Sequence, residues 1–523
     1  MPADLLFDNA KIIDGTGSPW FRGSVQISDG QIVSVTRQKS GESNSNSRID
    51  LNGLALCPGF IDLHSHSDLR LFSSPKLKPK VLQGITTEIL GQDGFSMAPM
   101  YPTGGAGEWE DHLSGLNGRA GQEWTWGSTK EYLDAIGNNG VGPNVGMLVG
   151  HGTVRFNVMG MDSRLPNNKE ITDMQQLIVE SLDQGALGLS TGLVYTPQVH
   201  SDTKEVQKLA SCLTEYGRPF VAHIRNEHNN IWTALDEFID IGSKEDIALH
   251  LSHFKTAGSK QHGKSQRAIE ILEAARERGV DITADQYPYT AGSTMLASFL
   301  PSWARSEDTE STINHLKENR EKIKEYLNTE TEASWDEMVI TSVKTREYRE
   351  YVGTSIADIA DEMNLTPAEA VINLLRHERL EIEQYSYHSI ESDVQNILQY
   401  RKSAIATDGL LGGKPHPRTY GTYPRVLGRY SRKLNLFSIE EAIRMMTSLP
   451  ARIMGLQQKG IIRSGNDADI VVFDPDKIGS EATYNNPRRF PDGIHYVFVN
   501  GSPVVKSGQY TGQTPGTVLR KGA

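Results

Sequence analysis

Hydrophobic and polar positions alternate over short stretches near both ends of the chain. Five aliphatic residues between positions 25 and 35 flank Asp29-Gly30, a pair of residues typical of tight hairpin turns. Near the other end, the segments 468–473 and 496–499 are rich in β-branched and aromatic residues and are followed by turn residues. We therefore expect one small β-sandwich domain, 1–56 plus 455–523, that brings both ends of the chain together.

The middle of the chain, 57–454, alternates short apolar runs with helical patterns, which is typical of parallel βα units. Eight apolar runs are candidate strands, at 56–63, 85–90, 144–149, 186–189, 219–222, 247–251, 281–284 and 404–406. Apolar residues recur at helical spacing in 171–184 and 267–278. This α/β pattern predicts a TIM-like (β/α)8 barrel, in which catalytic residues lie at the carboxyl ends of the strands.

The segment at about 301–383 is too long for a single βα connection. It is charged and mostly helical in pattern, as at 310–327 and 367–377. We interpret it as an insertion, which either covers the barrel mouth as a lid or packs on the outside.

Composition narrows the classes of partner and the cellular location. The net charge of −12 argues against nucleic acid, and an anionic ligand would need a locally positive pocket. No apolar run approaches the roughly 18 residues that span a bilayer, and no signal peptide is recognisable, so we expect no membrane partner. With only Cys57 and Cys212, a disulfide framework is excluded, which favours a cytoplasmic location. The oligomeric state stays open.

Residues that suit metal binding follow four of the predicted strands. His64 and His66 follow the first, His223 ends the fifth, His253 the sixth and Asp408 the eighth. Residues i and i+2 of an extended strand point to the same side, so the first two can share one ion. A lone histidine is more often a core residue, and Asp before Gly is usually a turn residue. Five such residues on one barrel rim instead indicate Zn²⁺, with other divalent metals possible.

This ligand set on strands one, five, six and eight resembles that of the amidohydrolase superfamily. More narrowly, the chain resembles the N-acyl-D-amino-acid deacylases, or D-aminoacylases. The matching motifs run in order over nearly the whole chain: Pro58-Gly-Phe-Ile-Asp-Leu-His-Ser-His66, Gly150-His-Gly-Thr-Val-Arg155, Gly185-Ala-Leu-Gly-Leu-Ser-Thr-Gly-Leu-Val-Tyr195, His223-Ile-Arg-Asn-Glu227, Ser252-His-Phe-Lys255, Asp285-Gln-Tyr-Pro-Tyr289 and Pro415-His-Pro-Arg418. Together they are very specific for the family and less so for its substrate.

One departure from the family concerns the metal ligands. Most superfamily members carry a carboxylated lysine on strand four, and 185–190 has no lysine here. The D-aminoacylases instead use a cysteine after strand two, and this chain has Asp93 at that position. A carboxylate can bridge two cations, so one or two zinc ions remain possible. The alternative interpretation is that Asp93 only shapes a turn with Gly94.

The resemblance implies roles for the residues around the metal. His223, His253 and Asp93 would bind one ion, with His64 and His66 at a second or alternative position. Bound metal lowers the pKa of water to about 7, so hydroxide can attack the amide carbonyl at neutral pH. Asp408 is the expected general base, which later protonates the leaving amine.

Other residues would hold the substrate or orient the ligands. Tyr287 is the expected donor to the oxyanion, with Tyr289 as the alternative. The residues expected to bind the substrate's α-carboxylate are Lys255, Arg418, Tyr195 and Ser293. His151, Asp285 and Glu227 are expected to support the metal ligands rather than react.

The resemblance implies an enzyme that hydrolyses N-acyl-D-amino acids to a carboxylate and a free D-amino acid. Two alternatives stay open. One is a cyclic-amide hydrolase of the dihydroorotase or hydantoinase type, or another amidase, because a metal core does not fix the substrate. The other is a catalytically silent homologue that binds a ligand, for which Asp93 at the cysteine position is the best support.

Overall fold

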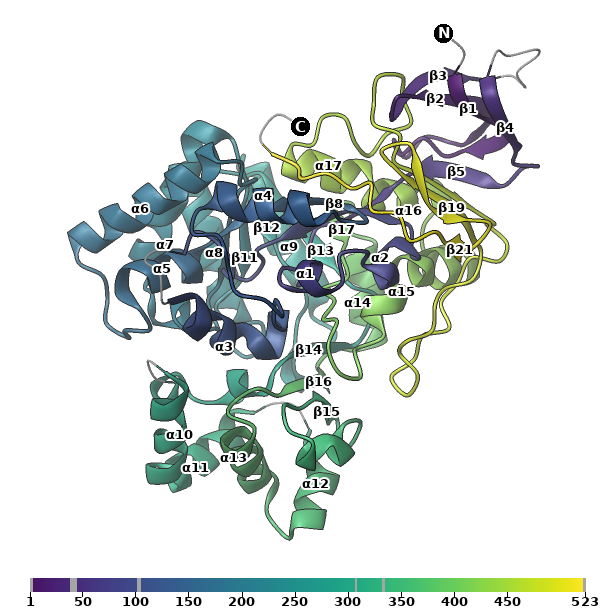
Figure 1. Cartoon of the computed structure of the whole chain (residues 1–523). Coiled ribbons are helices and arrows are strands. Elements are labelled where there is room, and N and C mark those ends of the chain that lie inside the picture. The colour runs from purple at the N-terminus through teal and green to yellow at the C-terminus, as the bar shows by residue number, and fades with distance from the viewer. Residues whose placement is uncertain (1–2, 38–44, 101–104, 306–307, 332–333, 521–523) are drawn as a thin grey trace.

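The computed structural model describes residues 3–37, 45–100, 105–305, 308–331 and 334–520 (Figure 1). Strands from both ends of the chain form one sheet with the order β21-β20-β19-β18-β5-β1-β2-β3, and β4 pairs with β1. These strands are β1 (Ala3–Ile12), β2 (Phe21–Ser28), β3 (Gln31–Thr36), β4 (Ser45–Asp50), β5 (Ala55–Pro58), β18 (Ile470–Phe473), β19 (Ile494–Val499), β20 (Ser502–Lys506) and β21 (Gln509–Tyr510). Strand β1 pairs with β2, β4 and β5, so the sheet folds over a core that contains Phe7, Val25 and Phe498 and forms the sandwich.

The barrel occupies the middle of the chain. Its strands are β6 (Phe60–Asp62), β7 (Ile85–Leu90), β8 (Asn144–Met147) with its continuation β9 (Val149–Gly150), β10 (Leu189–Gly192), β11 (Phe220–His223), β12 (Leu249–Leu251), β13 (Ile282–Gln286) and β17 (Ser403–Ile405). They form two parallel sheets, β6-β7-β8 and β9-β10-β11-β12-β13-β17. Hydrogen bonds from Leu187 N to Met147 O (2.8 Å) and from Asp408 N to His64 O (2.9 Å) join the sheets at both seams, so a (β/α)8 barrel closes.

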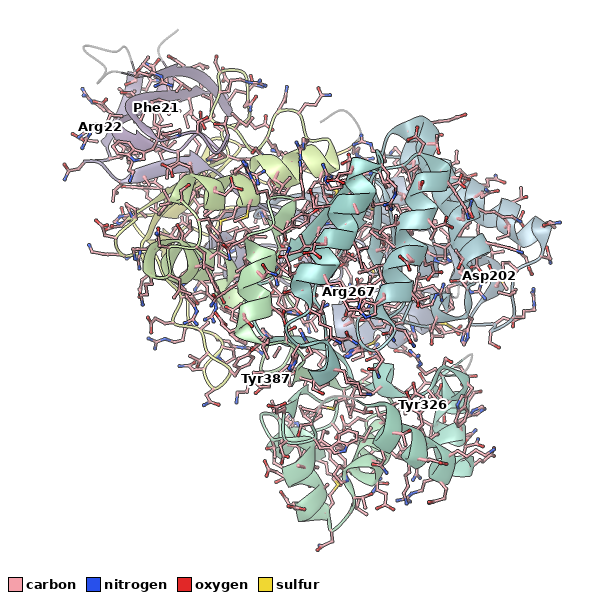
Figure 2. All side chains as sticks on the ribbon, turned by 180° about the vertical axis from the view of Figure 1, so that it is seen from behind. Phe21, Arg22, Asp202, Arg267, Tyr326 and Tyr387 are labelled. Carbon is pink, nitrogen blue, oxygen red and sulfur yellow. The ribbon has the colours of Figure 1, made fainter. Side chains whose placement is uncertain are left out.

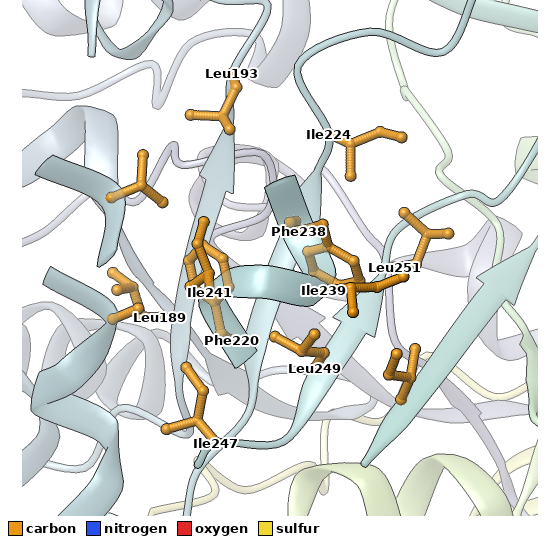
Figure 3. Packing of buried hydrophobic residues seen from close by; sticks show 14 of the residues in the cluster. Leu189, Leu193, Phe220, Ile224, Phe238, Ile239, Ile241, Ile247, Leu249 and Leu251 are labelled. Carbon is orange, nitrogen blue, oxygen red and sulfur yellow. The ribbon is translucent and has the colours of Figure 1, made fainter. Parts of the chain in front are cut away.

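Helices surround the barrel and bury the outer faces of its strands. They are α1 (Arg70–Ser73), α2 (Lys78–Val81), α3 (Gly105–Asn117), α4 (Thr129–Asn139), α5 (His151–Met159), α6 (Asn168–Asp183), α7 (Thr203–Ala210), α8 (Ile231–Glu245), α9 (Ser265–Glu277), α14 (Glu391–Leu398), α15 (Arg418–Arg425), α16 (Ile439–Met446) and α17 (Ser448–Met454). Figure 3 shows the packing of strand residues such as Leu189, Phe220 and Leu249 with Phe238 and Ile241 of α8. None of the helices in the described ranges is both long enough and apolar enough to cross a membrane.

Two predicted strands differ from those observed. The run 56–63 is divided at Gly59: β5 pairs with β18 in the sandwich, whereas β6 pairs with β7 in the barrel. The chain changes sheets there, and a Cβ at Gly59 would lie 2.1 Å from Thr86 Oγ1. The predicted strand 186–189 is β10 at Leu189–Gly192, because buried Ser190 and Thr191 extend it beyond the apolar run. The predicted helices 171–184 and 267–278 are confirmed as α6 and α9.

The C-terminal segment after β21 returns to the barrel. Val518 forms a parallel bridge with Val145 of β8, and Leu519 N donates to Val145 O at 2.7 Å. The last described residues therefore pack on the barrel rather than in the sandwich. The domain boundaries 1–56, 57–454 and 455–523 otherwise stay predictions.

The insertion forms a separate lobe that we call the insertion lobe, residues 291–387. Its described residues hold a sheet with the order β14-β16-β15 and four α-helices. These elements are β14 (Ala291–Met295), α10 (Thr309–Glu318), α11 (Arg320–Glu330), β15 (Met338–Ser342), α12 (Ile356–Met363), α13 (Pro367–His377) and β16 (Glu383–Tyr387). It has its own core, which includes Leu316, Ile340 and Leu375. The lobe projects from one side of the barrel, and Tyr326 and Tyr387 mark the part of it that faces the barrel (Figures 1 and 2).

Glu383, the first residue of β16, predicts a pH-dependent stability. Burial raises the pKa of this carboxyl group to about 8, and Arg70 only partly offsets the effect. The folded chain keeps this proton while the unfolded chain loses it, so stability falls as the pH rises from about 4.5 towards 8. We expect Glu383→Gln to stabilise the protein by about 2 kcal/mol at pH 8 and much less at about pH 5, measured by thermal unfolding.

The control for this prediction is Glu325→Gln, which changes an exposed glutamate of α11. It should alter stability by less than about 0.5 kcal/mol at either pH. Equal stabilisation by Glu383→Gln at both pH values would contradict the prediction.

Candidate metal centre and substrate cleft

Six side chains converge at one end of the barrel, and each is placed at or just after the end of a strand. They are His64 and His66 after β6, Asp93 after β7, His223 at the end of β11, His253 after β12 and Asp408 after β17. All six are at least nine-tenths buried. The structure thus brings together the residues that the sequence placed on one rim.

The carboxylate of Asp93 lies among the four imidazoles. Its Oδ1 atom is 3.6 Å from His64 Nε2 and 3.6 Å from His253 Nε2. The same oxygen is 3.9 Å from His223 Nδ1, and Asp93 Oδ2 is 3.5 Å from His66 Nε2. On the other side, Asp408 Oδ1 is 3.3 Å from His66 Nε2 and 3.7 Å from His64 Nε2. Two groups of candidate ligands therefore share His64: one contains Asp93 and His253, and the other contains His66 and Asp408.

These distances fit ligands of a shared ion better than hydrogen bonds. Both ring nitrogens of His64 and of His66, and Asp93 Oδ1, are buried and have no hydrogen-bond partner in the described parts of the chain. Leaving such groups unsatisfied is costly. Ligand atoms about 2.0 Å from a tetrahedral zinc ion lie roughly 3.3 Å from one another, close to the separations seen here. The imidazole and carboxylate donors therefore fit zinc.

The backbone at the site adopts an uncommon conformation. Asp93, His253 and Asp408 have positive φ angles of 56°, 35° and 48°. Residues other than glycine rarely occupy this region, and such strain concentrates at functional sites. Asp93 and Asp408 both precede glycine, and their carboxylates nevertheless lie beside the histidines, so a position in a turn does not prevent either residue from binding a metal.

Close backbone packing fixes the turn at Asp93. A Cβ at Gly192 would lie 2.4 Å from the Asp93 carbonyl oxygen, and one at Gly150 would lie 2.4 Å from the Gly94 carbonyl oxygen. Gln198 Nε2 donates to Asp93 O at 2.8 Å, and Ser190 Oγ accepts from Gly94 N at 3.0 Å. These glycines belong to the Gly-His-Gly and Ser-Thr-Gly motifs. Both motifs are distant from Asp93 in sequence, but they pack directly against the turn that holds it.

A second layer of acidic groups surrounds the histidines. Asp285 accepts hydrogen bonds from His253 N (2.7 Å) and His250 Nε2 (2.9 Å), and it lies 3.9 Å from His64 Nδ1. Glu227 Oε1 is 3.0 Å from His253 Nδ1 and accepts from Lys255 Nζ at 2.6 Å. Glu227 also forms a candidate ligand group with His223 and His253, a possibility that sequence reasoning missed.

Electrostatics keep the acidic residues charged and His223 neutral. Burial alone would raise the pKa of Asp408, but the Arg418 guanidinium and His64 hold it well below its usual range. The pKa of Asp93 is likewise held low by His64 and His253 against the effect of burial. Burial lowers the pKa of His223 to about 4, so its imidazole is neutral at pH 7 and has a lone pair to offer a metal.

A cleft of about 490 Å³ opens onto the cluster, a size typical of small-molecule sites. Arg418, fully buried, places Nη1 2.9 Å from Asp408 Oδ2 and lies over the Tyr287 ring at 4.6 Å. Its Nε atom is buried and has no hydrogen-bond partner among the described residues. Lys255 and Tyr195 also line the cleft, and the Tyr195 ring lies 5.3 Å from that of His223.

Three candidate residues have other partners. Ser293 lines the cleft, but its hydroxyl donates to Gln384 O at 2.9 Å, within the sheet of the insertion lobe. Tyr289 does not line the cleft; its hydroxyl lies 3.4 Å from Pro417 O. His151 contacts Thr191 Oγ1 at 3.0 Å and Glu205 Oε1 at 3.1 Å, and no hydrogen bond in the described structure joins it to the metal cluster.

Sequence reasoning also missed His388, directly after β16. Its Nε2 atom lies 3.1 Å from the Tyr287 hydroxyl, and it lines the cleft. Because it comes from the edge of the insertion lobe, no spacing in the barrel motifs points to it.

A buried lysine lies beneath the cluster. Lys80 of α2 has no exposed surface and contacts Glu88 Oε1 at 2.6 Å and Asp62 Oδ2 at 2.8 Å. It also donates to Thr407 Oγ1 (2.9 Å) and Ser65 Oγ (3.0 Å). Ser65 lies between His64 and His66, and Thr407 precedes Asp408. Lys80 therefore connects the first and last strands of the barrel where the metal-site residues begin.

A closed parallel barrel with a terminal sandwich and a rim of imidazoles and carboxylates defines a metal-dependent hydrolase of the amidohydrolase class. The model of the amidohydrolase family (Amidohydro_3) matches residues 48–241 and 402–505. The chain is 33% identical to D-aminoacylase and 31% identical to N-acyl-D-glutamate deacylase, both from Alcaligenes xylosoxydans xylosoxydans. These alignments cover 100% and 99% of this chain and 98% and 97% of the relatives.

Solved structures agree with these relationships. The crystal structure of N-acyl-D-glutamate deacylase from Bordetella bronchiseptica, complexed with zinc and a phosphonate mimic of the tetrahedral intermediate, matches with a TM-score of 0.86. It is 32% identical, over 99% of this chain and 100% of that chain. An L-hydantoinase from Arthrobacter aurescens, 12% identical over 99% of this chain and 100% of that chain with a TM-score of 0.58, shares the fold. The chain belongs to the N-acyl-D-amino-acid deacylase family of the amidohydrolases.

Proposed function

We propose that this protein hydrolyses the amide bond of N-acyl-D-amino acids and releases a carboxylate and a free D-amino acid. The observation that carries the proposal is the buried cluster of four imidazoles around Asp93, in which the ring nitrogens of His64 and His66 and Asp93 Oδ1 have no hydrogen-bond partner among the described residues. It lies at the base of a cleft that also holds the cations needed by a substrate with a free carboxylate.

The cofactor is zinc. His223, His253 and Asp93 would hold one ion, and His64, His66 and Asp408 offer a second group of donors. When bound, zinc supplies Lewis acidity that makes water a nucleophile at neutral pH. Asp285 and Glu227 contact the histidines and fix their orientation, which is the usual task of carboxylates around metal ligands.

Asp408 acts as the general base. It accepts a proton from the attacking water and returns it to the departing amine, which is otherwise a poor leaving group. Its ion pair with Arg418 keeps it deprotonated before substrate binds. Tyr287 donates to the developing oxyanion, because its buried hydroxyl lies in the cleft and burial raises its pKa, which keeps the proton on the oxygen.

Lys255 and Arg418 bind the α-carboxylate of the substrate. Arg418 has a buried Nε atom without a hydrogen-bond partner in the described structure, and its planar group suits bidentate binding of a carboxylate. Tyr195 and Ser293 line the same cleft and complete this subsite. These cations favour a linear substrate with a free carboxylate over an uncharged cyclic amide.

The decisive experiment compares N-acetyl-D-methionine, N-acetyl-L-methionine and dihydrouracil as substrates. We expect turnover of the D-compound alone, at least about 100-fold above the others in kcat/KM, together with zinc in the purified protein. Removal of the metal with a chelator should abolish turnover, and zinc should restore it. Turnover of dihydrouracil alone would support a cyclic-amide hydrolase. A protein without metal that gains no activity with zinc would support a silent homologue.

We also propose a cytoplasmic location. Cys57 is buried and Cys212 partly buried, and both are free thiols. This use of cysteine supports a reducing compartment. Secretion of the active enzyme by its native host, detected by fractionation, would contradict it.

A further inference from the structure

Arg305 is a partly buried cation that lines the cleft, and it has no carboxylate partner among the described residues. It lies at the end of the turn η5 (Ser302–Ala304) in the insertion lobe. Its Nη1 atom donates to Val194 O at 2.7 Å, whereas its Nε atom is buried and has no hydrogen-bond partner. No aspartate or glutamate of the described ranges lies within ion-pair distance of it.

The other cations of the cleft are all paired. Lys255 contacts Glu227 at 2.6 Å, and Arg418 contacts Asp408 at 2.9 Å. Arg225 forms two hydrogen bonds to Glu237, at 2.9 and 3.0 Å. Arg305 alone among these four has only a neutral carbonyl for a partner, and burial lowers the pKa of its guanidinium to about 10. A partly buried charge that lines a cleft and lacks a counter-charge is well placed to bind an anionic ligand.

Arg305 contacts a segment of the chain that also lines the cleft. The carbonyl group that it contacts belongs to Val194, the residue before Tyr195. The Tyr195 ring lies 5.3 Å from that of the metal-site residue His223. Arg305 therefore lines the same cleft as the metal cluster, and no hydrogen bond in the described structure joins it to Lys255 or Arg418, the pair that is assigned to the α-carboxylate.

We propose that Arg305 binds a second carboxylate of the substrate, so that the enzyme prefers dicarboxylic N-acyl-D-amino acids. The proposal rests on the proposed function. The second carboxylate can belong to the amino-acid side chain, as in D-glutamate, or to the acyl group, as in a succinyl group. A guanidinium recognises either one by the same charge-assisted hydrogen bonds.

Two isosteric substrate pairs test the proposal and distinguish the sources. The first pair is N-acetyl-D-glutamate and N-acetyl-D-glutamine; the second is N-succinyl-D-methionine and its succinamoyl analogue. The two members of each pair differ only in one group, which is a negatively charged carboxylate in one member and a neutral amide in the other. We expect the wild-type enzyme to favour the charged member of one pair by about 10- to 100-fold in kcat/KM, and the pair concerned identifies the source.

Variants of Arg305 connect the preference to this residue. Arg305→Met should lower kcat/KM for the charged substrate to about the value for its neutral partner, while kcat/KM for the neutral partner changes little. Arg305→Lys should keep part of the preference, because lysine retains the positive charge but lacks the paired N–H donors of a guanidinium group. The control Arg225→Met removes an arginine that lines the same cleft but is already paired with Glu237, and it should leave the preference unchanged.

The outcomes separate this proposal from the proposed function. Hydrolysis of all four substrates at similar kcat/KM would overturn the role of Arg305 and leave the proposed function standing. A preference for the charged substrate that persists in Arg305→Met would also overturn the role of Arg305 and leave the proposed function standing. Hydrolysis of none of the four, nor of N-acetyl-D-methionine, would overturn the proposed function itself. If Arg305→Met folds poorly, calorimetric binding of the product analogues D-glutamate and D-glutamine to the wild-type enzyme gives a second test, with equal affinity counting against a side-chain subsite.

Discussion

Asp408→Asn should retain zinc and lose about 10²- to 10⁴-fold in kcat, the range expected when a general base is removed. Asparagine has nearly the same shape as aspartate but cannot accept the proton of the attacking water. The histidines and Asp93 still provide donors for an ion without it. Metal content by elemental analysis, beside steady-state kinetics on N-acetyl-D-methionine, measures both parts of the prediction.

The matched control for this variant is Asp281→Asn. Asp281 is 72% exposed at the start of β13, at the opposite end of that strand from the metal cluster, so the same change of charge there should leave kcat within about twofold. Undiminished kcat in Asp408→Asn would remove Asp408 as the base. Loss of the metal together with the activity would instead assign Asp408 as an essential ligand.

Lys80→Met should lower the free energy of unfolding by about 3 to 5 kcal/mol, because it leaves two buried carboxylates without a counter-charge. Asp62 and Glu88 are both fully buried and lie within 2.8 Å of the Lys80 ammonium group. Urea unfolding monitored by circular dichroism measures the loss. Metal affinity should fall as well, because the network that joins the first and last strands lies directly beneath the ligands.

The control is Lys130→Met, which breaks a lysine–aspartate pair of similar length on the surface. Lys130 lies 2.6 Å from Asp134, but the two side chains are 63% and 42% exposed, so the cost should stay below about 1 kcal/mol. Adding Glu88→Gln to Lys80→Met should recover part of the lost stability. Equal urea midpoints for Lys80→Met and the wild type would contradict the prediction.

The barrel and much of its metal cluster could be predicted because both follow from regular repeats. Buried parallel strands are apolar runs, and the residue after each run lies on the common rim, so His64, His223, His253 and Asp408 meet although they are far apart in sequence. Asp93 was found only through the resemblance to a family. Its own signal, an aspartate before glycine, is that of an ordinary turn.

The remaining features could not be predicted, because they depend on the packing of distant segments. Lys80 lies on a four-residue helix, and nothing around it in sequence indicates that its ammonium group is buried beneath the barrel strands. Arg305 and His388 reach the cleft only because the insertion lobe folds against the barrel. Of the strands in that lobe, β14 lies before the predicted range of 301–383 and β16 extends beyond it, since these short strands lack a clear alternation of apolar and polar residues.

The insertion lobe has a hydrophobic core of its own, whereas the metal donors all come from barrel segments. Mutations that reshape the lobe can therefore accumulate without disturbing the reactive centre. Contacts that the lobe makes with a substrate can diverge while the metal donors stay the same, and grafting the lobe from one family member to another becomes a practical route to new substrate ranges.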